Sequence, residues 1–491
     1  MTGRRKLASA ALWRFSEVGL SEATSFAVFL ALARLVAPDA FGVVALAAVC
    51  IALGQPILTQ GIGEALIQRP RVSSALLDTA FWANMALGIA LAVCALIFGP
   101  LLAAITGEAR LGGALAAMSP IYILMAAGAI FQAKLRRELN FKAIALRSII
   151  AIVVGGATGL VLAAHGYGYY ALIGQQIAHN ATSLVVLMLA SSWKPKLRMR
   201  RTHLKQLIAF ARHTGVSSFT DFLVNRADIL IAGLFLSTHA VALYFFAKRI
   251  VFAAGLFTYY SIQQIGLPLL ARRLQQQDTR AARGETALMA LTLSTLICAP
   301  ALVALALLAD PLIAVSAGEE WRAAAGALSI LALGAAAMGL RITSGQALIA
   351  DGRPDVYARL TLMSAMLALG LVAIGATQGL LGAALGATLA HLLTLPFVLR
   401  ALGARFHLTA RALARPLVRG LLPCSAMAGA MWVSMPDAAH HTLLIQLAQP
   451  ACAGLLAWLC TVLAVFAPEL SHLMNRNPAP ATLRTHPAAD R

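Results

Sequence analysis

The sequence predicts an all-α polytopic membrane protein with about 14 transmembrane helices, and three observations support this fold class. Hydrophobic residues make up 60% of the 491 residues, and charged residues make up only 12%, about half the share in a soluble domain. The apolar residues form stretches long enough to cross a bilayer, and basic residues concentrate in alternate connections. This composition excludes a soluble enzyme, a disordered scaffold and a disulfide-stapled secreted module.

Each transmembrane helix is expected where about 20 apolar residues lie between charged, Gly or Pro residues. In chain order the predicted spans are 12–36, 41–67, 76–105, 111–133, 144–164, 168–192, 207–236, 240–271, 285–309, 322–350, 356–376, 379–400, 417–435 and 443–467. The first and the seventh spans carry several charged residues, which makes them the least apolar of the series.

Two lobes of six spans each are expected, because the first six spans and the next six have similar lengths and connections. Phe41–Leu46 and Val241–Phe246 are parallel fragments that lie 200 residues apart. Lobes of six spans have the same orientation, which predicts a pseudo-two-fold axis along the membrane normal. The predicted division is an N-terminal lobe (1–192), a basic cytoplasmic linker (193–206), a C-terminal lobe (207–402), two additional transmembrane helices (403–467) and a disordered cytoplasmic tail (468–491).

The formal net charge of +20 is explained by topology and does not indicate a nucleic-acid partner. With the N-terminus in the cytoplasm, thirty of the 39 Lys and Arg residues fall in inside segments. Only Arg34, Arg110 and Arg322 fall in outside loops or at outer helix ends. This asymmetry predicts an even number of spans with both termini in the cytoplasm.

The motifs of common catalytic and metal sites are absent from the sequence. It contains no GxSxG, HExxH or Walker motif, and its six cysteines lie in apolar stretches without a CxxC pair. We therefore expect no catalytic residues, no metal and no cofactor, and we predict that the protein is not an enzyme.

Ionisable and polar residues within the predicted spans are the candidate functional residues, because an unpaired charge in a bilayer is costly. Five basic residues are candidates for binding the phosphates of an anionic substrate: Arg14, Arg226, Lys248, Arg249 and Arg341. Six further residues are candidates for lining the same cavity or for binding a coupling ion: Glu17, Glu22, Glu64, Asp221, Asn225 and Asp228. Structural ion pairs and snorkelling of basic side chains to the headgroups remain alternatives for these residues.

Segments along nearly the whole chain resemble one family of transporters. They are LVAPDAFGVVALA (35–47), GIGEALIQR (61–69), LDTAFWANMALG (77–88), LRRELNFKAIAL (135–146), SSWKPKLR (191–198), NRADILIAG (225–233), LPLLARRLQ (267–275), GEEWRAAAGAL (318–328) and IADGRPDV (349–356). On these segments the chain resembles the Wzx-type polysaccharide flippases of the multidrug/oligosaccharidyl-lipid/polysaccharide exporter superfamily. Most of them are signatures of loops and helix ends.

The resemblance implies a protein of the bacterial inner membrane that moves a polyprenyl-diphosphate-linked oligosaccharide from the inner to the outer leaflet. The product would serve the assembly of O-antigen, exopolysaccharide or capsule. Two six-helix lobes would alternate access around a cationic cavity. Implied partners are this lipid-linked oligosaccharide, the bilayer, a polysaccharide polymerase and the machinery that controls chain length and export.

Family positions can be matched to this sequence at a few residues. The matches are Glu64, Asp78, Asn225, Asp228 and Arg249, and Arg226 follows Asn225 in the same segment. At position 248 the resemblance implies an aromatic or small residue, whereas this chain has Lys, which adds positive charge.

Carrying a diphosphate and a sugar through hydrocarbon without help would cost tens of kcal/mol, and a cationic cavity removes most of that cost. An inside-negative potential favours expulsion of an anion by about 2.3 kcal/mol per charge per 100 mV, and coupling to this potential, to H+ or to Na+ is open. Alternatives are a flippase for peptidoglycan-precursor lipid and a cation-coupled multidrug exporter. A membrane-embedded polymerase or ligase belongs to a different class and is disfavoured by the short outer loops.

Overall fold

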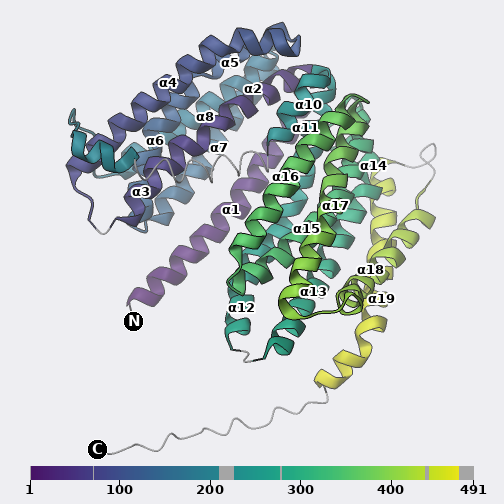
Figure 1. Ribbon diagram of the computed structural model, residues 1–491. Helices are drawn as coiled ribbons and strands as arrows, with labels where there is room; N and C mark the ends of the chain where they lie inside the picture. The colour runs from purple at the N-terminus through teal and green to yellow at the C-terminus, as the bar shows by residue number, and fades with distance from the viewer. Residues whose placement is uncertain (1, 70, 209–225, 277–278, 437–441, 475–491) are drawn as a thin grey trace, which may run out of the picture.

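The computed structural model describes residues 2–69, 71–208, 226–276, 279–436 and 442–474 (Figure 1). Every regular element in these residues is a helix, and none of them forms a β-strand. The predicted all-α class is confirmed.

The helices fall into an N-terminal and a C-terminal group. The N-terminal group comprises α1 (Thr2–Leu35), α2 (Pro38–Pro56), the π-helical turn η1 (Ile57–Gly61), α3 (Ile62–Gln68), α4 (Ser74–Thr106), α5 (Ala109–Met118), α6 (Pro120–Arg137), α7 (Phe141–Ala164) and α8 (Tyr169–Ala190). The C-terminal group comprises α10 (Ala227–Phe235), α11 (Thr238–Phe257), α12 (Tyr259–Gln275), α13 (Arg280–Leu307), α14 (Ala309–Ser316), the 3₁₀ helix η2 (Glu319–Ala324), α15 (Ala325–Ala350), α16 (Pro354–Ala376), α17 (Leu380–Phe406), α18 (Ala410–Val433) and α19 (Leu443–Met474).

Eleven helical segments of the described residues are long and apolar enough to cross a membrane, and each overlaps one predicted span. The other three predicted spans are not among these eleven segments. The span 12–36 corresponds to α1, the span 207–236 lies largely outside the described residues and ends with α10, and the span 417–435 lies in α18. The prediction of a polytopic membrane protein is therefore confirmed.

Helix starts follow from short polar side chains that cap the backbone. The side chains of five N-cap residues each accept a hydrogen bond from an amide in the first turn: Ser73, Asn140, Ser237, Thr279 and Thr409. Such caps satisfy donors that a helix start leaves without partners.

Some predicted spans are interrupted helices. The span 41–67 is built from α2, η1 and α3, and the π-helical turn follows Pro56 directly. Proline lacks the amide proton that a regular helix needs, so a local change of helix type is expected at this point. The span 240–271 is likewise divided into α11 and α12 at Thr258.

The two groups of helices meet where α2 and α11 begin (Figure 1). The Nδ1 atom of His239 on α11 donates a hydrogen bond of 2.9 Å to the carboxylate of Asp39 on α2. These residues are 200 positions apart, which equals the offset of the predicted repeat. Under the predicted repeat, the contact would join equivalent ends of the two halves. We call it the α2–α11 junction.

Further contacts close the α2–α11 junction. The hydroxyl of Thr238 donates a hydrogen bond of 2.6 Å to Glu108, the N-cap residue of α5. A hydrogen bond from the Arg110 guanidinium is the main reason that the pKa of Glu108 is lowered to about 2. A Cβ atom at Gly42 would lie 2.0 Å from the carbonyl oxygen of Thr238, so only glycine permits this approach of α2 to α11.

An aromatic cluster lies beneath the α2–α11 junction. The buried ring of Trp321 stacks on Phe246 at 4.4 Å between centroids and meets Phe41 edge-on at 5.1 Å. Its indole nitrogen donates to the carbonyl of Ala33 at 2.7 Å. The structure is therefore closed at the end that the sequence predicts to face outward, and the halves are joined there by packing as well as by polar contacts.

Candidate functional site

The candidate residues divide into those that the structure describes and those that it does not. Arg14 and Glu17 lie in α1, but their side chains are outside the described part of the chain. Asp221 and Asn225 are also outside the described residues. The remaining candidates are Glu22, Glu64, Arg226, Asp228, Lys248, Arg249 and Arg341.

Arg249 of α11 bridges the two groups of helices within the membrane region. Its guanidinium lies 3.3 Å from the carboxylate of Glu22 and donates a hydrogen bond of 3.1 Å to the hydroxyl of Ser25, both on α1. The guanidinium also lies over the ring of Phe252, 5.6 Å from its centroid. The side chains of Arg249 and Glu22 are 21% and 37% exposed, so this ion pair remains accessible to a ligand.

Ser25 also lines a polar cavity of about 220 Å³ between α1, α7 and α8. Its polar wall is formed by Gln175, Gln176, His179 and Asn180, which all come from α8. These four residues are not among the candidates predicted from the sequence. The run QQIAHN (175–180) within an otherwise apolar span was the signal that could have identified them.

Two glycines of α7 bring the walls of this cavity together. A Cβ atom at Gly155 would lie 2.9 Å from the carbonyl oxygen of Gln175, and one at Gly156 would lie 2.6 Å from Val28 of α1. Small residues at such positions let membrane helices pack closely, which here places the amide side chains of α8 beside Ser25.

A second cavity, of about 130 Å³, lies inside the C-terminal group and contains three candidate residues. Lys248 donates to both carboxylate oxygens of Asp228, at 2.8 Å and 2.7 Å, and the Tyr244 hydroxyl donates to the same carboxylate at 2.9 Å. Arg341 of α15 and His391 of α17 line the same cavity. We call it the C-terminal cavity.

Arg341 is the most deeply buried of the described candidates, with 2% of its surface exposed. Its guanidinium donates a long hydrogen bond, of 3.5 Å, to the hydroxyl of Thr361, and its Nε has no hydrogen-bond partner among the described residues. The Nδ1 atom of His391 also has none in that part of the chain.

Glu64 lies apart from the other candidates, in the N-terminal group. Its carboxylate is 3.6 Å from the guanidinium of Arg136, and both residues line a cavity of about 160 Å³ with Thr59, Gln60 and Gln132. Arg226 is exposed at the N-cap of α10.

Asp78, a family-matched position, is buried and holds the linker. Its Oδ1 accepts hydrogen bonds of 3.1 Å from the Trp193 indole and from the backbone amide of Lys196. The structure thus places the described candidates at four positions and gives Asp78 a structural contact.

A family model described as "Polysaccharide biosynthesis protein" matches residues 31–326, which is more than half of the chain. The chain belongs to this family. The predicted resemblance to polysaccharide flippases is confirmed.

Two relatives of this polysaccharide biosynthesis protein match over most of their length. The succinoglycan biosynthesis transport protein ExoT of Rhizobium meliloti is 24% identical over 348 residues, which cover 71% of this chain and 70% of ExoT. The lipopolysaccharide biosynthesis protein WzxC of Escherichia coli is 23% identical over 396 residues, which cover 80% of this chain and 79% of WzxC. ExoT is named a transport protein, which agrees with the prediction that the present protein is not an enzyme.

A solved structure shares the fold of this polysaccharide biosynthesis protein. The lipid II flippase MurJ in an inward closed conformation aligns with a TM-score of 0.73 over 94% of this chain and 100% of the MurJ chain, at 13% identity. The fold is therefore shared, although the sequences have diverged.

Proposed function

We propose that the protein is a flippase that moves a lipid-diphosphate-linked oligosaccharide from the inner to the outer leaflet of a bacterial inner membrane. The product would be used to assemble a surface polysaccharide. The observation that carries this proposal is that Ser25 belongs to two sites at once. It accepts a hydrogen bond from Arg249 and lines the amide-rich cavity of α8.

Arg249 is the proposed contact for the diphosphate. A guanidinium presents several donors in a fork that matches phosphate oxygens, and the Arg249 side chain is partly exposed. Its present partner, Glu22, would be displaced by the more highly charged diphosphate. Arg226, which is exposed at the start of α10, supplies a second positive charge.

The amide-rich cavity is the proposed contact for the sugars. Glutamine, asparagine and serine side chains offer both donors and acceptors, as the hydroxyl groups of sugars require. Because Ser25 is shared, a diphosphate at Arg249 would place the first sugars beside Gln176 and Asn180. The lipid tail would stay in the bilayer, so that only the polar head crosses within the protein.

Closure at the α2–α11 junction supports an alternating-access cycle. The junction closes the predicted outer end, so substrate would enter from the cytoplasmic side, where both termini are proposed to lie. The inside-negative membrane potential is the proposed driving force, because the transported head is anionic. A polysaccharide polymerase acting on the outer leaflet is the proposed downstream partner.

The proposal is tested in proteoliposomes with a fluorescent short-chain polyprenyl diphosphate, with and without an attached oligosaccharide. Arg249→Gln is expected to slow flipping of both lipids by roughly tenfold, which corresponds to about 1.4 kcal/mol. Gln176→Ala combined with Asn180→Ala should slow only the glycosylated lipid.

The matched control is Arg322→Gln, which removes a guanidinium from the predicted outer surface and should leave the flipping of both lipids unchanged. Unaltered flipping in the Arg249 variant and in the double variant would refute the assignment. Transport of cationic drugs in place of the lipids would favour a multidrug exporter.

A further inference from the structure

The described residues that line the C-terminal cavity leave the charge of Arg341 without a carboxylate partner. Among these described lining residues there are one carboxylate, on Asp228, and two cations, on Lys248 and Arg341. Counting His391 as neutral, one negative and two positive charges leave a net charge of +1. Asp228 is bound by Lys248 and Tyr244, so it does not serve as the counter-ion of Arg341.

Arg341 lines this cavity with a guanidinium whose hydrogen-bonding capacity is largely unused among the described residues. It is 2% exposed, it makes one long hydrogen bond, to Thr361, and its Nε has no partner among the described residues. A buried guanidinium without a carboxylate loses its hydration and gains little in return, which is a large cost in free energy. A bound anion would remove that cost.

The size and lining of the C-terminal cavity restrict the kind of anion. A volume of about 130 Å³ excludes an oligosaccharide with its diphosphate. Half of the lining side chains are apolar, including Val251, Leu331 and Met338, and the surface that they expose to the cavity is mainly apolar, which favours a weakly hydrated anion over a strongly hydrated one. A monovalent anion would neutralise the net charge of +1, whereas a divalent anion would reverse it.

We propose that the C-terminal cavity binds one small, weakly hydrated monovalent anion of the halide class against Arg341. The Nδ1 atom of His391, which has no partner within the described residues, would donate to the same anion when it carries the proton. This site is distinct from the proposed diphosphate contact at Arg249, and its existence does not depend on the transported substrate.

The ligand would stabilise the C-terminal group of helices. The cavity is bounded by α10, α11, α12, α15, α16 and α17, so an anion at its centre would hold these six helices around one charge. A ligand that binds only the folded state raises the midpoint of unfolding as its concentration rises.

The test is the thermal unfolding of the purified full chain in detergent, in mixtures of potassium chloride and potassium gluconate at constant ionic strength. Gluconate is too bulky and too strongly hydrated for the C-terminal cavity. We expect the Tm of the wild-type protein to rise with the logarithm of the chloride concentration, and bromide to replace chloride. Equal Tm values in chloride and gluconate would overturn the proposal.

Three variants locate the effect. Arg341→Gln and the cavity-filling Ala335→Leu should both lose the chloride dependence, and Ala335→Leu retains every charge if Arg341→Gln does not fold. Arg359→Gln is the matched control, because Arg359 lies on the adjacent helix with a side chain that is 79% exposed, and it should keep the full chloride dependence. Chloride dependence that persists in Ala335→Leu would overturn the assignment of the site.

Discussion

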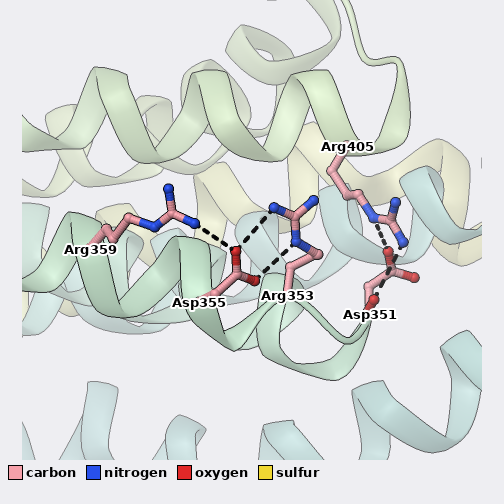
Figure 2. Close-up of polar contacts among 5 residues, drawn as sticks. All are labelled: Asp351, Arg353, Asp355, Arg359 and Arg405. Atoms are coloured by element: carbon pink, nitrogen blue, oxygen red, sulfur yellow. Dashed lines mark hydrogen bonds and ion pairs between the residues drawn. The ribbon is translucent and has the colours of Figure 1, made fainter.

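Asp351 shows how one buried carboxylate organises the predicted cytoplasmic end of the C-terminal helices (Figure 2). Its side chain is 5% exposed and accepts hydrogen bonds from Arg405 at the end of α17 and from Arg283 near the start of α13, the latter at 3.1 Å. Asp351 itself follows the last residue of α15. Asp351 therefore connects the ends of α13, α15 and α17. This contact gives the segment IADGRPDV (349–356) a role in holding these helices together.

Asp355, four residues further on, provides a natural comparison. It pairs with Arg353 and Arg359, as Figure 2 also shows, but its side chain is 46% exposed. Both of its partners are local in sequence. Water therefore competes with these ion pairs, and their contribution to stability is expected to be small.

We predict that Asp351→Asn lowers the free energy of unfolding by about 1–3 kcal/mol, because two guanidinium groups lose a buried charged partner. Asp355→Asn, the matched control, should change it by less than about 0.5 kcal/mol. Unfolding of the purified proteins in detergent by a denaturant measures both values. Equal losses in the two variants would contradict the distinction between buried and exposed carboxylates.

At the scale of elements, glycine determines how closely α16 and α17 pack. A Cβ atom at Gly386 of α17 would lie 2.2 Å from the carbonyl oxygen of Leu371, and one at Gly382 would lie 2.1 Å from the carbonyl oxygen of Gly375. Backbone that approaches backbone at this distance leaves no room for a side chain. Leu371 and Gly375 lie on α16, so these two glycines mark the surface on which α17 meets α16.

Gly386→Ala is expected to destabilise the protein by about 1–3 kcal/mol, because backbone atoms that cannot rotate away must shift. Gly370→Ala on α16 is the matched control, because nothing lies within 4 Å of the position of its added methyl group. Alanine favours helix, so this control should be neutral or stabilising by up to about 1 kcal/mol. A thermal shift assay compares the two variants. Similar effects of both would contradict the packing argument.

For the whole molecule, the α2–α11 junction joins the two groups of helices at the predicted outer end. Contacts between the groups of helices concentrate at this end through Asp39 with His239, Glu108 with Thr238, and the close approach at Gly42. In the proposed alternating-access cycle, these contacts would separate to give access from the other leaflet. The junction would then be the gate of that cycle.

Locking this gate should stop transport. We predict that Asp39→Cys combined with His239→Cys, in a background without the six native cysteines, loses flipping activity when a short bifunctional thiol reagent joins the pair. A cleavable reagent should restore activity after reduction, because the lock acts on the conformation alone. Each single-cysteine variant serves as a control and should remain active after the same treatment. Full activity of the cross-linked protein would show that transport does not need this end to open.

The sequence by itself determined the fold class, the positions of most spans and the family. These follow from local properties, because a segment crosses the bilayer only if it is long and apolar, and its charge count fixes its preferred side. The sequence also identified charged residues within spans, such as Arg249 and Arg341, as exceptional, because the cost of a charge depends on its position along a span.

Only the tertiary structure decided which charges meet. Arg249 pairs with Glu22, 227 positions away, whereas Lys248 at the neighbouring position turns to Asp228 and the C-terminal cavity. Adjacent residues on a helix point in different directions, so the packing of the helices around them determines the partner of each. The same packing placed the amides of α8 beside Ser25 and left Arg341 without a counter-ion among the described residues, and no local pattern contains that information.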